Sequence, residues 1–143
     1  MLAVWRLHGF DRAWEKALSS GTVLAGVSAG SICWFQSGVT DSFGKEFKEI
    51  NCLGFLQGSH CPHYDSEEQR RSSYQRLLEV GMVGGYAADD GVGLHFIDGY
   101  LHKIVFSRPH AKVYRVEVSE GRVVETPIAP ILLDNQLPNK SVN

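Results

Sequence analysis

The sequence lacks the features that mark several large classes of protein. Its 14 lysines and arginines nearly balance 16 aspartates and glutamates, which leaves a net charge of −2, and neither sign forms a long run. The basic stripe typical of a nucleic-acid-binding protein is therefore missing. The longest mostly apolar stretch, residues 23–35, contains two serines and is too short to span a bilayer. We expect neither a nucleic acid nor a membrane as a partner.

Cysteine is also scarce. The three cysteines, at positions 33, 52 and 61, are an odd number at irregular spacing, which does not suggest a disulfide framework. The N-terminus lacks the charged start, the apolar core and the cleavage site of a signal peptide. We therefore expect a reduced, cytoplasmic protein. Apolar residues make up 43% of the 143-residue chain, and this composition predicts a single globular domain over 1–143.

The first half of the chain alternates between patterns typical of helices and of strands. Residues 1–19 place apolar side chains at the spacing of an amphipathic helix, and Gly21 is a natural stop. Residues 22–27, TVLAGV, are a short apolar run that predicts a buried, parallel strand. The other expected segments are, in chain order, a helix over 29–36, a loop over 38–44, a strand entering a loop over 53–64, and a helix over 66–80 capped by Asp65 or Ser66, with Tyr74, Leu77 and Leu78 facing the core.

In the second half of the chain, the spacing of apolar residues is that of strands. Residues 92–97 and 100–107 flank Asp98-Gly99, a signal for a type I′ hairpin turn, and residues 111–118 and 122–126 form a second hairpin pattern. The polar tail, 133–143, is expected to fray. The fold class is thus α/β, with a small, mostly parallel sheet, flanking helices and a C-terminal antiparallel β-meander.

The pentapeptide Gly26-Val27-Ser28-Ala29-Gly30 has the form G-x-S-x-G and lies between an expected strand and an expected helix. In that context the pattern predicts a nucleophile elbow, a tight turn that exposes the serine hydroxyl. Ser28 is then the candidate nucleophile, and the Ala29 N–H is the candidate donor to a developing oxyanion. The alternative is a glycine-rich turn in which Ser28 only caps a helix.

A serine nucleophile needs a base and an orienting carboxylate. Among the six histidines, His60 and His63 lie in a loop after a strand, and His63 is the first choice for the base. Candidates for the carboxylate are Asp41, Asp65, Asp89, Asp90 and Asp98. The alternative that His60, Cys61 and His63 bind a metal is disfavoured because their spacing is cramped and no second ligand pair follows. No nucleotide or dinucleotide fingerprint is present, so we expect neither a metal nor a cofactor.

These motifs together resemble the peptidase E family, serine peptidases whose best-known members are aspartyl dipeptidases. The resemblance is carried by GVSAGSICWF (26–35), TDS (40–42), CPHYD (61–65) and the Asp89-Asp90-Gly91 loop, in the family's order. It implies that Ser28 is the nucleophile, His63 the base and Asp90 the acid of the triad, and that the substrates are short peptides.

The chain departs from the family in two ways. It starts after the position of a Gly-Gly-Gly-Asn loop that donates part of the family's oxyanion hole, so we expect the family's usual N-terminal half to be lacking. A homodimer, or a complex with a separately encoded N-terminal half, would cover the sheet edge left exposed. The position of the family's substrate-binding arginine holds Glu67. Arg70 and Arg71 are therefore the candidate substrate-binding residues, together with Asp41.

The sequence thus predicts a serine-type, dipeptidase-like peptidase with a Ser-His-Asp triad. Two alternatives stay open. One is a truncated homologue, weakly active or inactive, that acts as an interaction module, and the other is an esterase with a G-x-S-x-G elbow.

Overall fold

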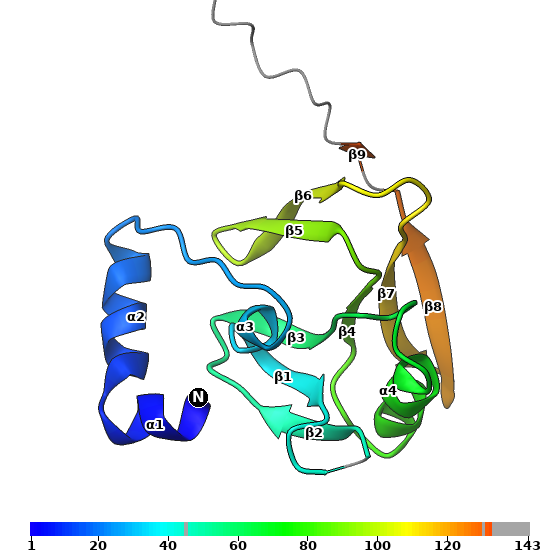
Figure 1. Cartoon of the computed structure of the whole chain (residues 1–143), viewed down its shortest axis with the longest axis horizontal. Coiled ribbons are helices and arrows are strands. Elements are labelled where there is room, and N and C mark those ends of the chain that lie inside the picture. The colour runs from blue at the N-terminus through cyan, green and yellow to red at the C-terminus, as the bar shows by residue number, and fades with distance from the viewer. Residues whose placement is uncertain (45, 130, 133–143) are drawn as a thin grey trace, which may run out of the picture.

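The chain is built around a six-stranded mixed sheet, shown in Figure 1. The computed structural model describes residues 1–44, 46–129 and 131–132. The strands of this sheet run in the order β2 (Lys48–Asn51), β1 (Phe35–Thr40), β3 (Leu56–Cys61), β4 (Gly85–Ala88), β7 (Val113–Ser119) and β8 (Arg122–Ile128). Strand β3 is parallel to both β1 and β4, whereas the other three pairs are antiparallel. The α/β class is therefore confirmed.

A second, three-stranded sheet crosses above the first. It contains β5 (Val92–Ile97), β6 (Tyr100–Phe106) and β9 (Ile131–Leu132). Both predicted hairpins are confirmed, and the positive φ angles of Asp98 and Gly99 are those of the expected turn. The two hairpins lie in different sheets, because β6 pairs with β9 while β7 pairs with β4. The tail over 133–143 lies outside the described residues.

The main core lies between the six-stranded sheet and helix α4 (Arg70–Glu79). Tyr74 and Leu78 are almost fully buried, as the sequence predicted, and Leu77 is partly buried beside them. The Tyr74 hydroxyl is 2.6 Å from the Ser59 hydroxyl of β3, which ties the helix to the central strand. The helix begins later than expected, at Arg70, and neither Asp65 nor Ser66 caps it, because Gln69 occupies the N-cap.

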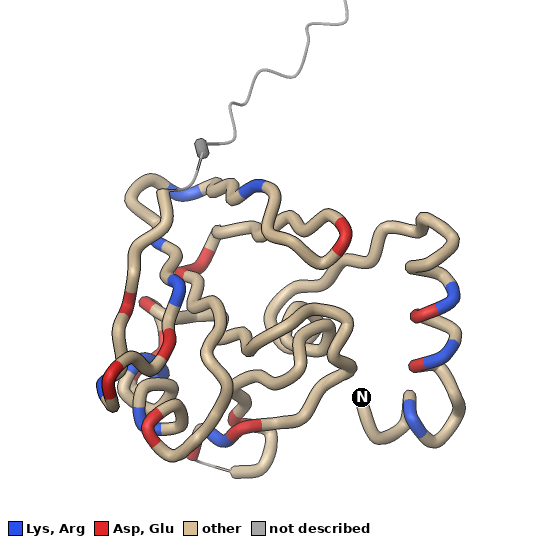
Figure 2. The backbone as a smooth tube through the Cα atoms, turned by 180° about the vertical axis from the view of Figure 1, so that it is seen from behind, with Lys and Arg blue, Asp and Glu red and all other residues tan. Residues whose placement is uncertain are grey.

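The N-terminal segment forms two helices, α1 (Leu2–Leu7) and α2 (Phe10–Ser19), instead of the single helix predicted. Gly9 separates them with a φ of 71°, a conformation that interrupts a helix and suits glycine. Helix α1 contacts the turn before β1 through Trp5, whose ring stacks on Trp34 at a centroid distance of 6.2 Å. Its Arg6 donates to the Cys52 carbonyl at 2.8 Å. Acidic and basic residues alternate along α2 (Figure 2).

The predictions for residues 22–36 are wrong in two places. Residues 22–27 form no strand, and Val23 and Val27 are each 87% exposed, because no strand among the described residues pairs with this segment. The helix expected over 29–36 is one turn, α3 (Ala29–Ile32). It ends there because Phe35 pairs with Leu56 and starts β1, which also takes in the first part of the loop expected over 38–44.

None of the helices in the described part of the chain has the length and apolar character needed to cross a membrane.

Candidate active site

Ser28 lies at a sharp turn immediately before α3. Its φ of 54° and ψ of −122° are unusual for a residue with a side chain, and such strain is a feature of nucleophile elbows. The turn also explains the first glycine of the motif, Gly26. A Cβ on Gly26 would lie 1.9 Å from the carbonyl oxygen of Gly30, so the chain can pass this closely only without a side chain there. The sequence pattern and the local geometry therefore agree.

His63 is carried by the segment that follows β3. Its φ of 60° turns the imidazole towards α3, where Nε2 lies 2.7 Å from the Ser28 hydroxyl oxygen. The next residue anchors this segment to the neighbouring strand, because the Tyr64 N–H donates to the Ala88 carbonyl at 3.1 Å. The imidazole that contacts Ser28 is thus that of His63, the histidine that the sequence favours over His60 as the base.

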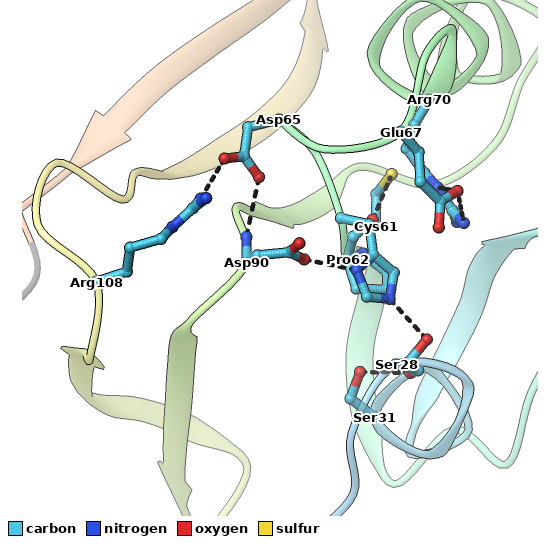
Figure 3. Close-up of polar contacts among 10 residues, drawn as sticks. Ser28, Ser31, Cys61, Pro62, Asp65, Glu67, Arg70, Asp90 and Arg108 are labelled. Atoms are coloured by element: carbon cyan, nitrogen blue, oxygen red, sulfur yellow. Dashed lines mark hydrogen bonds and ion pairs between the residues drawn. The ribbon is translucent and has the colours of Figure 1, made fainter.

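Asp90 follows β4, the strand parallel to β3, and its loop meets His63 at the same end of the sheet. Its Oδ1 lies 2.6 Å from His63 Nδ1. Ser28 and Asp90 therefore contact the two different nitrogens of the imidazole, and both residues are labelled in Figure 3. The side chains of His63 and Asp90 are 27% and 42% exposed, so solvent reaches the site. The structure therefore brings together the three residues that the sequence singled out.

The contacts fix the hydrogen-bonding roles around the imidazole. The Ser66 hydroxyl and then the His63 ring lower the pKa of Asp90 from its ordinary value, against the opposing effect of burial. Asp90 is thus ionised at neutral pH and accepts the Nδ1–H of His63. Nε2 then carries the lone pair and accepts the Ser28 hydroxyl proton. This arrangement can take a proton from a serine that attacks a carbonyl carbon.

The other candidate carboxylates have different contacts. Asp89 Oδ2 accepts the Lys112 N–H at 2.8 Å, whereas the carboxylate that contacts His63 is that of Asp90. Burial raises the pKa of Asp89. Asp65 accepts the Asp90 N–H at 3.0 Å and pairs with Arg108, contacts that the sequence did not predict because the Asp65-x-x-Glu68 spacing resembles a helix cap. Asp41 is exposed just after β1, and Asp98 lies in the β5–β6 turn.

His60 and Cys61 belong to the core. His60 stacks on Phe35 at 5.0 Å, its Nδ1 lies 3.1 Å from the Tyr86 carbonyl, and burial lowers its pKa to about 4. Cys61 is fully buried, which raises its pKa to about 12. Among the residues that the structure describes, no three His, Cys, Asp or Glu side chains are grouped as a metal site requires.

The two candidate substrate-binding arginines are both engaged within the chain. Arg70 is buried, donates to the Val39 carbonyl at 3.0 Å and pairs with Glu67. Arg71 pairs with Glu125 of β8, but its side chain remains 53% exposed.

The Ala29 N–H is at the first position of α3, where a helix offers no internal acceptor for it.

A surface hollow lies at the opposite ends of β3 and β4 from the triad. It has a volume of about 810 Å³ and is lined by residues such as Gly58, Tyr86, Tyr100 and Arg115. Ser28, His63 and Asp90 do not line it. The hydrogen bonds among the three side chains define the candidate site, because catalysis requires contact between the reacting groups and a hollow alone provides none.

Comparison with known proteins identifies the family of this chain. Residues 1–104 match the sequence model of peptidase family S51, and the chain therefore belongs to this family, the peptidase E family. A protein of Bacillus subtilis (strain 168) described as the uncharacterized peptidase YgaJ is 48% identical over 129 residues. The aligned part is 90% of this chain and 56% of that protein, so the chain spans about half the length of this curated relative.

Proposed function

We propose that this chain is a serine peptidase that hydrolyses short peptides through Ser28, His63 and Asp90. The observation that carries the proposal is the continuous pair of hydrogen bonds, 2.7 Å from Ser28 to His63 Nε2 and 2.6 Å from His63 Nδ1 to Asp90. Membership of peptidase family S51 supports the same chemistry. These hydrogen bonds join three segments that are distant in the sequence. They therefore do not arise simply from local structure.

The first half of the proposed reaction forms an acyl-enzyme. Ser28 Oγ attacks the carbonyl carbon of the scissile peptide while His63 Nε2 takes the hydroxyl proton. Asp90 holds the Nδ1–H and stabilises the imidazolium. The negative charge that develops on the carbonyl oxygen is stabilised by the Ala29 N–H. His63 then gives its proton to the leaving amine, and the C–N bond breaks.

The second half releases the acid product. Water attacks the ester between Ser28 and the acyl group, and His63 Nε2 takes a proton from that water. Collapse of the second tetrahedral intermediate breaks the bond to Ser28 Oγ, which regains its proton from His63. No external electron donor or acceptor enters the cycle.

Activity measurements on the purified chain test this proposal. We expect stoichiometric labelling by a fluorophosphonate and release of free amino acids from dipeptides. Hydrolysis of p-nitrophenyl esters without any peptide cleavage would favour an esterase. Absence of both activities, with no labelling, would favour an inactive interaction module.

We propose that Arg71 recognises the carboxylate of acidic substrates, because its guanidinium is the more exposed of the two candidates. We expect Arg71→Gln to raise KM for an acidic dipeptide about tenfold, with a small change for a neutral one. Steady-state kinetics with both dipeptides measure this difference.

Two variants serve as controls for Arg71. Arg76→Gln removes an exposed arginine from the same helix and is expected to change neither KM. Arg70→Gln removes a buried one, and we expect lower thermal stability with both KM values affected alike. Equal changes in both KM values for Arg71→Gln would contradict its proposed role.

We also propose that a second copy of the chain covers residues 22–27. Val23 and Val27 are strongly exposed, and Leu7 of α1 is 81% exposed as well. Apolar surface of this kind is commonly covered by a partner, and identical chains most often associate with two-fold symmetry. Light scattering at micromolar concentration is expected to give the mass of a dimer. A monomer that binds a separate N-terminal half, or a monomer alone, would contradict the homodimer.

Finally, we propose the cytoplasm as the location of the protein. All three cysteines are buried and free, which suits a reducing compartment.

A further inference from the structure

The Asp90 loop is held by a second carboxylate, that of Asp65. Asp65 lies two residues after His63, and its Oδ1 accepts the backbone N–H of Asp90 at 3.0 Å. Its other oxygen pairs with Arg108 from the connection between β6 and β7. Figure 3 shows Asp65 between Arg108 and Asp90, with Asp90 directed at the imidazole. A chain of polar contacts therefore runs from Arg108 through Asp65 to the triad.

This contact matters because packing does not fix the carboxylate of Asp90. Its side chain is 42% exposed and lies on a loop, so water competes for its oxygens. The His63 segment holds the loop at one other point, because the Tyr64 N–H donates to the Ala88 carbonyl at 3.1 Å.

The remaining contacts of the loop are made by its other residues. Asp89 exchanges two hydrogen bonds with Lys112, and the Gly91 carbonyl accepts the Ser107 N–H at 2.9 Å. The Asp65 carboxylate is the group that binds the peptide N–H of Asp90 itself. The Asp90 N–H and Arg108 hold the pKa of Asp65 below its ordinary value despite burial, which keeps Asp65 an acceptor at neutral pH.

We propose that Asp65 is a positioning residue, which holds Asp90 against His63 through the Asp90 N–H, and that Arg108 in turn orients Asp65. This inference rests on the proposed function, because it assigns Asp65 to the support of that same triad.

The test compares variants of Asp65 that separate its two contacts. Asp65→Ala removes the acceptor for the Asp90 N–H, and we expect the rate of fluorophosphonate labelling to fall about tenfold. Asp65→Asn keeps an acceptor oxygen but loses the ion pair with Arg108, so we expect the labelling rate to fall by no more than about threefold. Arg108→Gln is expected to resemble Asp65→Asn.

A matched control removes a carboxylate from a different surface ion pair. Glu117 pairs with Arg115 on β7 at 3.3 Å, and both residues line the hollow at the opposite ends of β3 and β4 from the triad. We expect Glu117→Ala to label at the wild-type rate. Circular dichroism on every variant shows whether it is folded. Equal losses in Asp65→Ala and Asp65→Asn, or a wild-type rate in Asp65→Ala, would overturn the positioning role.

A second measurement does not depend on activity. NMR observes the Nδ1–H proton of His63, whose downfield signal depends on its hydrogen bond to Asp90. We expect this signal to weaken or move upfield in Asp65→Ala and to persist in Asp65→Asn and Glu117→Ala. If wild type is not labelled but the signal changes in this way, the proposed function fails and the positioning role holds. An unchanged signal in Asp65→Ala overturns the positioning role whatever the labelling shows.

Discussion

Replacement of Ser28 by alanine is expected to abolish fluorophosphonate labelling and to lower peptide hydrolysis by at least about a thousandfold, because no other group in the triad can form the acyl bond. The fold is expected to survive, since the Ser28 side chain is only partly buried and alanine needs no hydrogen-bond partner. Mass spectrometry of the labelled peptide identifies the modified residue, and circular dichroism measures the fold.

Ser72→Ala is the matched control. Ser72 lies exposed at the start of α4, and its hydroxyl donates to the Gln69 carbonyl at 3.1 Å, so we expect normal labelling. Ser31 is the competing nucleophile to exclude, because its hydroxyl lies one helical turn from Ser28 and donates to the Ser28 carbonyl at 2.7 Å. Label recovered on Ser31 in the Ser28→Ala variant would contradict the assignment of the nucleophile.

The second large effect is expected at Asp90. Asp90→Asn preserves the shape of the side chain but offers an amide in place of a carboxylate, so the imidazole loses the partner that selects its Nδ1–H tautomer. We expect kcat to fall by about 10³ to 10⁴ with a smaller change in KM. Steady-state kinetics on a dipeptide give both constants.

The adjacent carboxylate provides the control for Asp90. Asp89→Asn keeps an oxygen that can accept the Lys112 N–H, and its side chain does not contact His63 in the structure. We expect kcat within a few-fold of wild type for this variant. If Asp89→Asn lost as much activity as Asp90→Asn, the orienting carboxylate would have to be reassigned.

The elements that the sequence predicted best are those with strong local signals. Asp98-Gly99 has the turn chemistry of a two-residue hairpin, and the apolar spacing of Tyr74 and Leu78 marks the buried face of a helix. G-x-S-x-G predicted the turn at Ser28, because the close contact of Gly26 with Gly30 requires glycine. In each case the physical cause acts over a few neighbouring residues.

The errors fall where distant contacts decide. Residues 22–27 have the composition of a buried strand, yet composition does not show whether a neighbouring strand is present to pair with them. The sequence predicts neither β2 nor β4, and it divides β1 between a helix and a loop, because these strands form by pairing with segments distant in the chain. Asp65 was assigned to a helix cap on local spacing, whereas its partners are 25 and 43 residues away.

For the site, spacing alone left the base and the carboxylate open. The family resemblance selected His63 and Asp90, and the structure supplies a physical reason for their proximity. They follow β3 and β4, two adjacent parallel strands, whose carboxyl ends meet at one edge of the sheet. The sequence predicts a strand at β3 but none at β4, and it does not show that the two segments are neighbours.

The unpaired segment over 22–27 leads directly into Ser28. The position of the nucleophile therefore depends, on one side, on a stretch of backbone with no strand of the described chain beside it. A partner that paired with this stretch would restrict the motion of Ser28 as well as cover Val23 and Val27. Under the proposed dimerisation, specific activity would rise with protein concentration, and dilution below the dissociation constant would switch the enzyme off without any change to its catalytic residues.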